Sequence, residues 1–162
     1  MGSTEKDIFR KDFEEAIFKK KKLLETLASQ IDRLYEIKNL LAQTLNSGFS
    51  IFLCGNGGSA ADCQHFAAEL TGRFEIDRRP LKVISLTTDT SALTAIANDF
   101  SFEEIFSRQL EALGKNGDCL IAISTSGMSL NVVRAVEQAR NNGIQTIGLL
   151  GKDGGVLAKS CD

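Results

Sequence analysis

Four short apolar segments alternate with helical stretches from residue 50 onward, and this alternation restricts the fold more than any other feature of the chain. The apolar segments are 50–54, 81–86, 119–123 and 146–150. Helices are expected between them at about 60–72, 91–97, 102–113 and 130–142. Short strands separated by helices are typical of a parallel sheet with both faces covered. The sequence therefore predicts an α/β domain with a parallel sheet flanked by helices.

The region from about residue 5 to residue 46 has the period of an α-helix, and Gly48 supplies a stop. It is long for one globular helix, so two helices or one bent helix are expected. Its apolar stripe needs a partner, part of it on the sheet and part on another subunit. We therefore expect N-terminal helices at 1–48, used for packing and as an oligomer interface, and a second domain at 49–162.

Composition narrows the function classes. The 162 residues suit a single core, and a net charge of −2 gives no basic field for nucleic acid or an anionic membrane. No apolar run reaches the roughly 18 residues of a membrane span, and the N-terminus does not resemble an export signal. Four cysteines without C-x-x-C spacing are expected to be buried, reduced thiols. These features predict a cytoplasmic protein.

The loop after the first apolar segment is rich in glycine, with the sequence Gly55-Asn56-Gly57-Gly58-Ser59. Glycines let a backbone approach a ligand closely, and the following helix start offers N–H groups to an anion. A simpler interpretation makes Ser59 and Asp62 a capping box. The glycine spacing also fits a permissive dinucleotide motif, but no acidic residue ends the second strand convincingly to bind a ribose.

The loop after the third apolar segment is rich in hydroxyls, with the sequence Ser124-Thr125-Ser126-Gly127-Met128-Ser129. Short donors around a glycine at a helix N-terminus suit a phosphate monoester. Helix capping is the alternative, although it would need only one of the four hydroxyls. Lys152 lacks the neighbours of a nucleotide-binding P-loop, which disfavours nucleotide hydrolysis.

His65 and Glu69 lie four residues apart on one face of the expected first helix of the domain. A carboxylate near a bound sugar could move a proton between adjacent carbons, and the pair could share a metal ion. The alternative is an ordinary surface pair. His65 is the only histidine in the chain, so these residues cannot form a histidine-rich zinc site unaided.

Several blocks in order closely resemble the phosphoheptose isomerases, which are SIS-domain enzymes on a Rossmann-like sheet. The first block covers 54–62 and 64–74, and later blocks lie at 86–99, 123–127 and 151–155. The resemblance implies an aldose–ketose isomerase that converts sedoheptulose 7-phosphate to D-glycero-D-manno-heptose 7-phosphate, an entry to the heptoses of lipopolysaccharide. It also implies a cytoplasmic homotetramer whose sites are shared between subunits.

The resemblance also assigns roles to single residues. Glu69 would be the catalytic acid/base and would touch the substrate, and it would bind zinc together with His65. The residues expected to contact the sugar are Asn56, Gly57, Gly58, Ser59, Asn98 and Asp99. Those expected to hold the phosphate are Ser124, Thr125, Ser126 and Ser129.

Two departures from the family pattern stand out. Met128 takes a place that is commonly asparagine. The family also continues past the position of Asp162 through a strand and a long helix, and that helix supplies a glutamine and a histidine to the metal. The remaining zinc ligands are therefore expected beyond Asp162, and the domain as given is expected to lack that strand and helix.

Two non-enzymatic SIS proteins remain as alternatives. One relative binds the bacterial replication initiator and lacks the equivalent of Glu69, and regulatory SIS domains sense sugar phosphates without needing metal. The presence of Glu69 within Glu-Leu-Thr-Gly-Arg favours the enzyme.

Overall fold

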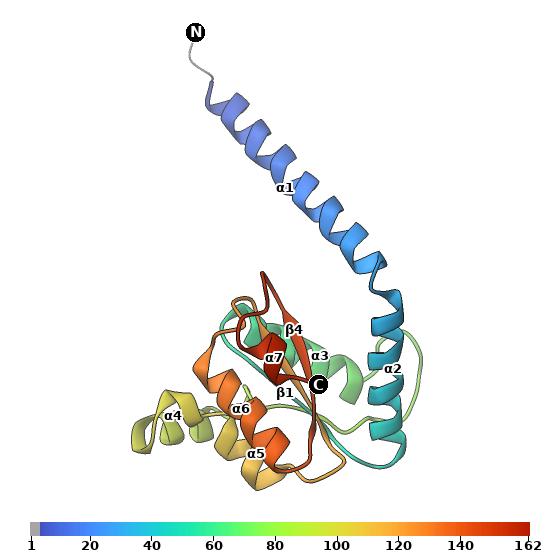
Figure 1. Cartoon of the computed structure of the whole chain (residues 1–162), viewed down its shortest axis with the longest axis vertical. Coiled ribbons are helices and arrows are strands. Elements are labelled where there is room, and N and C mark those ends of the chain that lie inside the picture. The colour runs from blue at the N-terminus through green and yellow to red at the C-terminus, as the bar shows by residue number, and fades with distance from the viewer. Residues whose placement is uncertain (1–3) are drawn as a thin grey trace. The chain divides into compact units, whose positions relative to one another are not determined.

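The computed structural model describes residues 4–162 (Figure 1). Its elements in chain order are α1 (Glu5–Ala28), α2 (Ile31–Asn46), β1 (Ile51–Gly55), α3 (Gly58–Thr71), β2 (Val83–Ser85), α4 (Thr90–Asp99), η1 (Phe102–Glu104), α5 (Ser107–Leu113), β3 (Cys119–Ser124), α6 (Leu130–Asn141), β4 (Gln145–Leu150) and α7 (Leu157–Ser160). They form two compact units that divide after Asn39, inside α2. The predicted domain boundary at residue 48 stays a prediction. No helix among the described residues is long and apolar enough to cross a membrane.

The N-terminal region forms two helices, as predicted, with the break at Ser29 and Gln30. Thr4 starts α1 with a capping box, because its hydroxyl accepts the Asp7 N–H at 3.2 Å while the Asp7 carboxylate accepts the Thr4 N–H at 3.0 Å. Within its unit α1 buries no side chain. Its large exposed apolar residues are Ile8, Phe9, Phe13, Ile17, Phe18, Leu23, Leu24 and Leu27.

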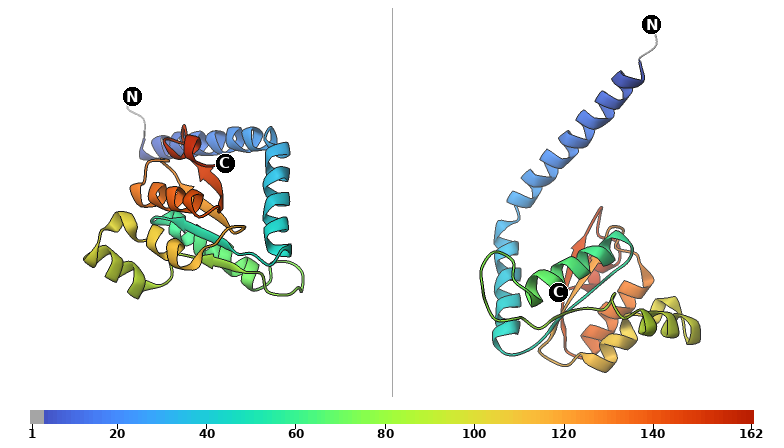
Figure 2. Two further views of the ribbon diagram at one scale, coloured as in Figure 1. Left: turned by 60° about the horizontal axis from the view of Figure 1, so that its bottom comes forward. Right: turned by 180° about the vertical axis from the view of Figure 1, so that it is seen from behind.

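The second unit is built on a parallel sheet with strand order β2-β1-β3-β4. The chain moves from β1 to β2 in one direction and from β3 to β4 in the other. Right-handed crossovers therefore put α3 on one face and α6 on the opposite face (Figure 2). Helix α3 packs on β1 and β2, α6 packs on β3 and β4, and α5 packs against α6. The predicted parallel α/β fold is confirmed.

This topology produces a switch point between β1 and β3. Their connections leave in opposite directions, so a crevice opens outside the carboxyl ends of these two strands, where α/β sheets bind ligands. The strands are paired up to Gly55 opposite Ile123. Both loops singled out from the sequence begin at this edge.

Some boundaries differ from those predicted. Strand β2 spans only Val83–Ser85 rather than 81–86, because only these three residues pair with β1. The helix predicted at 102–113 is divided into η1 and α5, since Ile105 and Phe106 turn into the core between them.

Cysteine burial follows the prediction, with one qualification. Cys54, Cys63 and Cys119 are buried free thiols, whereas Cys161 is only partly buried. Burial raises the pKa of Cys63 and of Cys119 from 9.0 to about 12, and it also raises the pKa of Cys54. These three thiols therefore stay protonated and weakly nucleophilic at neutral pH.

Candidate active site

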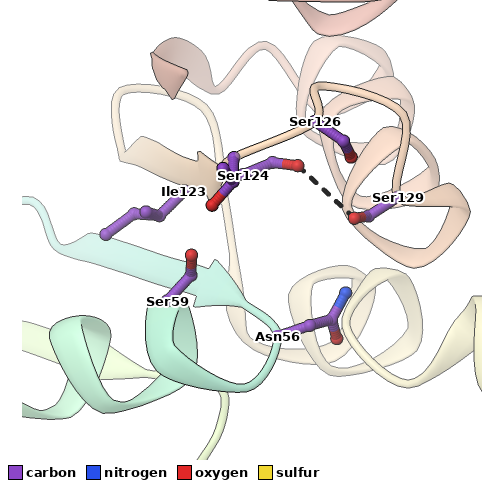
Figure 3. Close-up of a pocket in the computed structure, with 7 residues that line it drawn as sticks. Asn56, Ser59, Ile123, Ser124, Ser126 and Ser129 are labelled. Carbon is purple, nitrogen blue, oxygen red and sulfur yellow. Dashed lines mark hydrogen bonds between the residues drawn. The ribbon is translucent and has the colours of Figure 1, made fainter. Parts of the chain in front are cut away.

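A cavity of about 160 Å³ opens at the switch point (Figure 3). It is lined by Asn56, Ser59, Ile123, Ser124, Thr125, Ser126 and Ser129. All of these except Ile123 were predicted site residues. The volume is below the roughly 300–1,000 Å³ of a typical small-molecule site, so these residues enclose part of a ligand rather than a whole sugar phosphate.

The glycine loop brings the start of α3 against the sheet edge. A Cβ at Gly55 would lie 2.9 Å from the Ile123 carbonyl oxygen, so only glycine fits this approach. Helix α3 begins at Gly58, two residues earlier than predicted, and its N-cap residue Gly57 forms no side-chain cap. The capping-box interpretation of Ser59 is therefore wrong. Ser59 lies in the first turn, and its hydroxyl points toward Ser124 across the cavity (Figure 3).

Two hydroxyls determine the shape of the serine loop, which is the segment 124–129 after β3. The Ser124 Oγ accepts the Gly127 N–H at 3.1 Å, and the Ser126 Oγ accepts the Met128 N–H at 3.2 Å. Gly127 has φ +64, a conformation that favours glycine. The loop thus curls back over the end of β3 and directs its polar side chains toward one point.

Ser129 occupies the N-cap position of α6, yet its hydroxyl makes no capping hydrogen bond. Its Oγ lies 3.4 Å from the Ser124 Oγ on the cavity wall (Figure 3). The first-turn amides of α6, at Leu130 and Asn131, have no partner inside the helix, and the helix dipole is positive at this end. The Ser129 hydroxyl, which caps nothing, lies beside these amides and completes a neutral donor set suited to a phosphate.

A second glycine-rich loop, at residues 151–155 after β4, packs against the serine loop. The Gly151 N–H donates to the Ser124 carbonyl at 3.1 Å, and the Leu157 N–H donates to the Gly127 carbonyl at 3.1 Å. A Cβ at Gly127 would overlap the carbonyl oxygen of Gly154. The Met128 sulfur accepts the Val156 N–H at 3.4 Å, so this departure from the family pattern faces the supporting loop rather than the cavity.

The other predicted site residues do not line this cavity. His65 Nε2 lies 3.2 Å from Glu69 Oε1, with side chains 76% and 36% exposed. Ser59 and Glu69 are ten positions apart in α3, and this spacing corresponds to about 15 Å along the helix axis. Asn98 and Asp99 are exposed at the end of α4, where they bond each other at 2.7 Å. Gly57 and Gly58 belong to the glycine loop without forming the cavity wall.

The predicted zinc ion can be tested against the donors present. Imidazole nitrogen and carboxylate oxygen are ligand types that zinc prefers, and both belong to adjacent turns of α3. A zinc site needs three or four protein ligands, and residues 4–162 contain no group of three or more His, Cys, Asp or Glu side chains placed to hold a metal. The pair therefore fits part of a zinc site.

Sequence reasoning missed Asn131, which holds Asn56 by two hydrogen bonds of 2.8 Å. The position of Asn131 in the helical pattern of α6 could have identified it from the sequence. Asn131 lies four residues before Ala135 on the apolar face of α6, and a polar residue on such a face must find partners when it is buried.

Comparison with known proteins identifies the family of the chain. The family model of the SIS domain matches residues 13–151. The chain is 55% identical over 141 residues to a phosphoheptose isomerase of Aliarcobacter butzleri, covering 87% of this chain and 73% of the relative. It is 51% identical over 156 residues to that of Helicobacter pylori strain P12, covering 96% and 80%.

Solved structures give the same result. The phosphoheptose isomerase of Neisseria gonorrhoeae superposes with a TM-score of 0.86 at 43% identity, covering 98% of this chain and 82% of that one. The enzyme of Francisella tularensis gives 0.89 at 35% identity, covering 99% and 82%. The chain therefore belongs to the SIS domain family and, within it, to the phosphoheptose isomerases.

Proposed function

We propose that the protein is an aldose–ketose isomerase that converts sedoheptulose 7-phosphate to D-glycero-D-manno-heptose 7-phosphate in bacterial heptose biosynthesis. The observation that carries this proposal is the hydroxyl-lined cavity at the switch point, beside the N-terminus of α6. The names of the relatives supply the reaction. The buried, reduced thiols support a cytoplasmic location.

The cavity holds the phosphate end of the substrate. Hydroxyls of the serine loop and the first amides of α6 donate to the phosphate oxygens, so no lysine or arginine is required. Binding energy obtained at this end fixes the reacting end of the sugar, where it lowers the barrier to proton transfer.

The chemistry moves one proton between neighbouring carbons. Glu69 as carboxylate removes a proton from C1 of the open-chain ketose and returns it to C2 of the enediol. In the same exchange the C2 carbonyl oxygen gains a proton and the C1 hydroxyl loses one, which leaves the aldose and restores the carboxylate. A zinc ion, when bound, would polarise the sugar oxygens.

Completion of the site requires a second copy of the chain in this proposal. The cavity is small, and Glu69 of the same chain is several helical turns from Ser59. A Glu69 from another subunit could meet the carbonyl end of a substrate whose phosphate lies in the cavity. The apolar residues that α1 leaves unburied within its unit support such an assembly, which we propose to be a homotetramer.

His65 and Glu69 are proposed as two of the zinc ligands, with the others outside residues 4–162 or on another subunit. Replacing His65 by Ala should lower the zinc content after dialysis by at least about tenfold, because an imidazole ligand is lost. Elemental analysis by mass spectrometry measures this directly. The control is Asp62→Asn, a change at an exposed residue of the same helix. Equal zinc content in the unsubstituted protein, His65→Ala and Asp62→Asn would mean that His65 is not a zinc ligand.

The test of the function is conversion of sedoheptulose 7-phosphate by the purified, zinc-supplemented protein, followed by ¹³C NMR of the carbonyl carbons. Sedoheptulose without the phosphate is the matched substrate and should react far more slowly. Absence of conversion would overturn the proposal and favour a non-catalytic SIS protein.

Ser129→Ala tests the phosphate end of the site. The substitution should raise KM for the sugar phosphate by roughly tenfold, because a donor is lost. The free energy of unfolding should fall by less than about 1 kcal/mol, since this hydroxyl caps nothing and makes only the 3.4 Å contact with the Ser124 Oγ. Steady-state kinetics and urea unfolding measure the two quantities. Ser107→Ala removes a hydroxyl that bonds only the Glu104 carbonyl and should leave KM unchanged. A Ser129→Ala protein with normal KM would place the phosphate elsewhere.

A further inference from the structure

The two loops of the cavity are joined by one pair of amide side chains. Asn56 Nδ2 donates to Asn131 Oδ1 at 2.8 Å, and Asn131 Nδ2 donates to Asn56 Oδ1 at 2.8 Å. Asn56 follows β1 and lines the cavity, whereas Asn131 is 2% exposed in the first turn of α6. Each amide thus presents one donor and one acceptor to the other.

The backbone decides which way this pair is oriented. The Val132 N–H also donates to Asn131 Oδ1, at 3.0 Å. This N–H can only face an oxygen, so the Asn131 amide cannot be reversed without opposing two donors. The fixed Asn131 amide in turn fixes the Asn56 amide. The Asn56 Nδ2 must face the Asn131 Oδ1, and the Asn56 Oδ1 must face the Asn131 Nδ2.

We propose that Asn131 is a positioning residue that holds the Asn56 amide in one orientation toward the substrate. Asn56 keeps one N–H and one lone pair outside the pair, and Figure 3 shows its nitrogen on the side of Ser129. The cavity therefore receives one amide donor from Asn56 in a fixed place. The role in catalysis rests on the proposed isomerase function, but the orientation of Asn56 does not.

Asn131→Asp separates this role from simple packing. The carboxylate has nearly the same shape and can accept from Val132 and Asn56, but it cannot donate to Asn56 Oδ1. Its protonated form has one donor and one acceptor, as asparagine has. We expect kcat/KM relative to the unsubstituted protein to be reduced roughly tenfold to a hundredfold at about pH 8.5 and to recover as the pH is lowered to about 5, since the carboxyl regains its donor when it is protonated.

The matched control is Asn142→Asp at the opposite end of the same helix, where the side chain only accepts from Gln138 at 3.1 Å. It should leave kcat/KM unchanged at both pH values, even where it alters the melting temperature. Two outcomes overturn the inference. One is normal kcat/KM for Asn131→Asp throughout. The other is an equal loss at both pH values, which would indicate general damage to the fold.

A second measurement tests the orientation without activity. In a ¹⁵N-labelled protein the two side-chain amide protons of Asn56, assigned by their loss in Asn56→Ala, should give well-separated signals that exchange slowly. In Asn131→Ala they should move toward the values of a free amide. If the substrate is not converted but these signals respond, the isomerase proposal fails while the positioning stands. Unchanged Asn56 signals in Asn131→Ala overturn the positioning.

Discussion

Replacing Glu69 by Gln is expected to reduce kcat by roughly 100-fold to 10,000-fold, with a change in KM below about threefold. Glutamine keeps the size of the side chain and an oxygen that can face a cation, but it cannot take up the proton from the substrate carbon. The proposed phosphate-binding residues of the serine loop are unchanged by this substitution, so binding should persist. Stopped-time NMR assays give kcat, and calorimetry with the sugar phosphate gives affinity.

Glu111→Gln is the control for this experiment, because Glu111 is an exposed carboxylate on α5 that belongs to neither loop. It should retain full activity. Zinc must be measured in parallel, so that a lost metal is not mistaken for a lost base. If Glu69→Gln turns over normally with its zinc in place, another group carries the proton.

Replacing Gly127 by Ala should lower the free energy of unfolding by about 2–5 kcal/mol, because two penalties combine. The residue has φ +64, and its new methyl group would overlap the Gly154 carbonyl, which belongs to the backbone and cannot rotate away. The serine loop must shift to relieve the overlap, so binding of the sugar phosphate should also fall by at least about tenfold. Urea unfolding and calorimetry measure the two losses.

Gly48→Ala separates the two penalties. Gly48 has φ +83, yet a Cβ there would have no heavy atom within 4 Å. The substitution should therefore cost only about 1–2 kcal/mol and leave substrate binding intact. Equal destabilisation by the two substitutions would mean that the contact between Gly127 and Gly154 contributes nothing.

Local patterns were enough to predict most of the fold. The strands at β1, β3 and β4 follow from apolar runs that end in glycine or hydroxyl loops, and the parallel order follows from the helices between them. The start of α3 could not be predicted correctly, because Ser59 and Asp62 have the spacing of a capping box, whereas the helix begins at Gly58 with Gly57 as its N-cap. Strand β2 was overestimated because the apolar run 81–86 is longer than the segment that pairs with β1, and a propensity pattern does not contain this pairing.

The candidate site was predictable where it depends on one loop at a time. The serine and glycine loops were identified from their composition, and the structure brings Ser59 and Ser124 to one cavity. The bond between Asn56 and Asn131 joins residues 75 positions apart, so no local pattern contains it. The distance of Glu69 from Ser59 also depends on where α3 begins and how it crosses the sheet.

The pairing of β1 with β3 has a consequence for substrate selection. Both walls of the proposed phosphate-binding cavity start from neighbouring strands, which lie about 4.8 Å apart. A mouth this narrow suits the small terminal group shared by all sugar monophosphates and is insensitive to the number of carbons behind it. In the proposed function, discrimination between a seven-carbon and a six-carbon sugar must therefore come from the groups that contact the carbonyl end. The end of the site opposite the phosphate-binding cavity then determines which chain length is accepted.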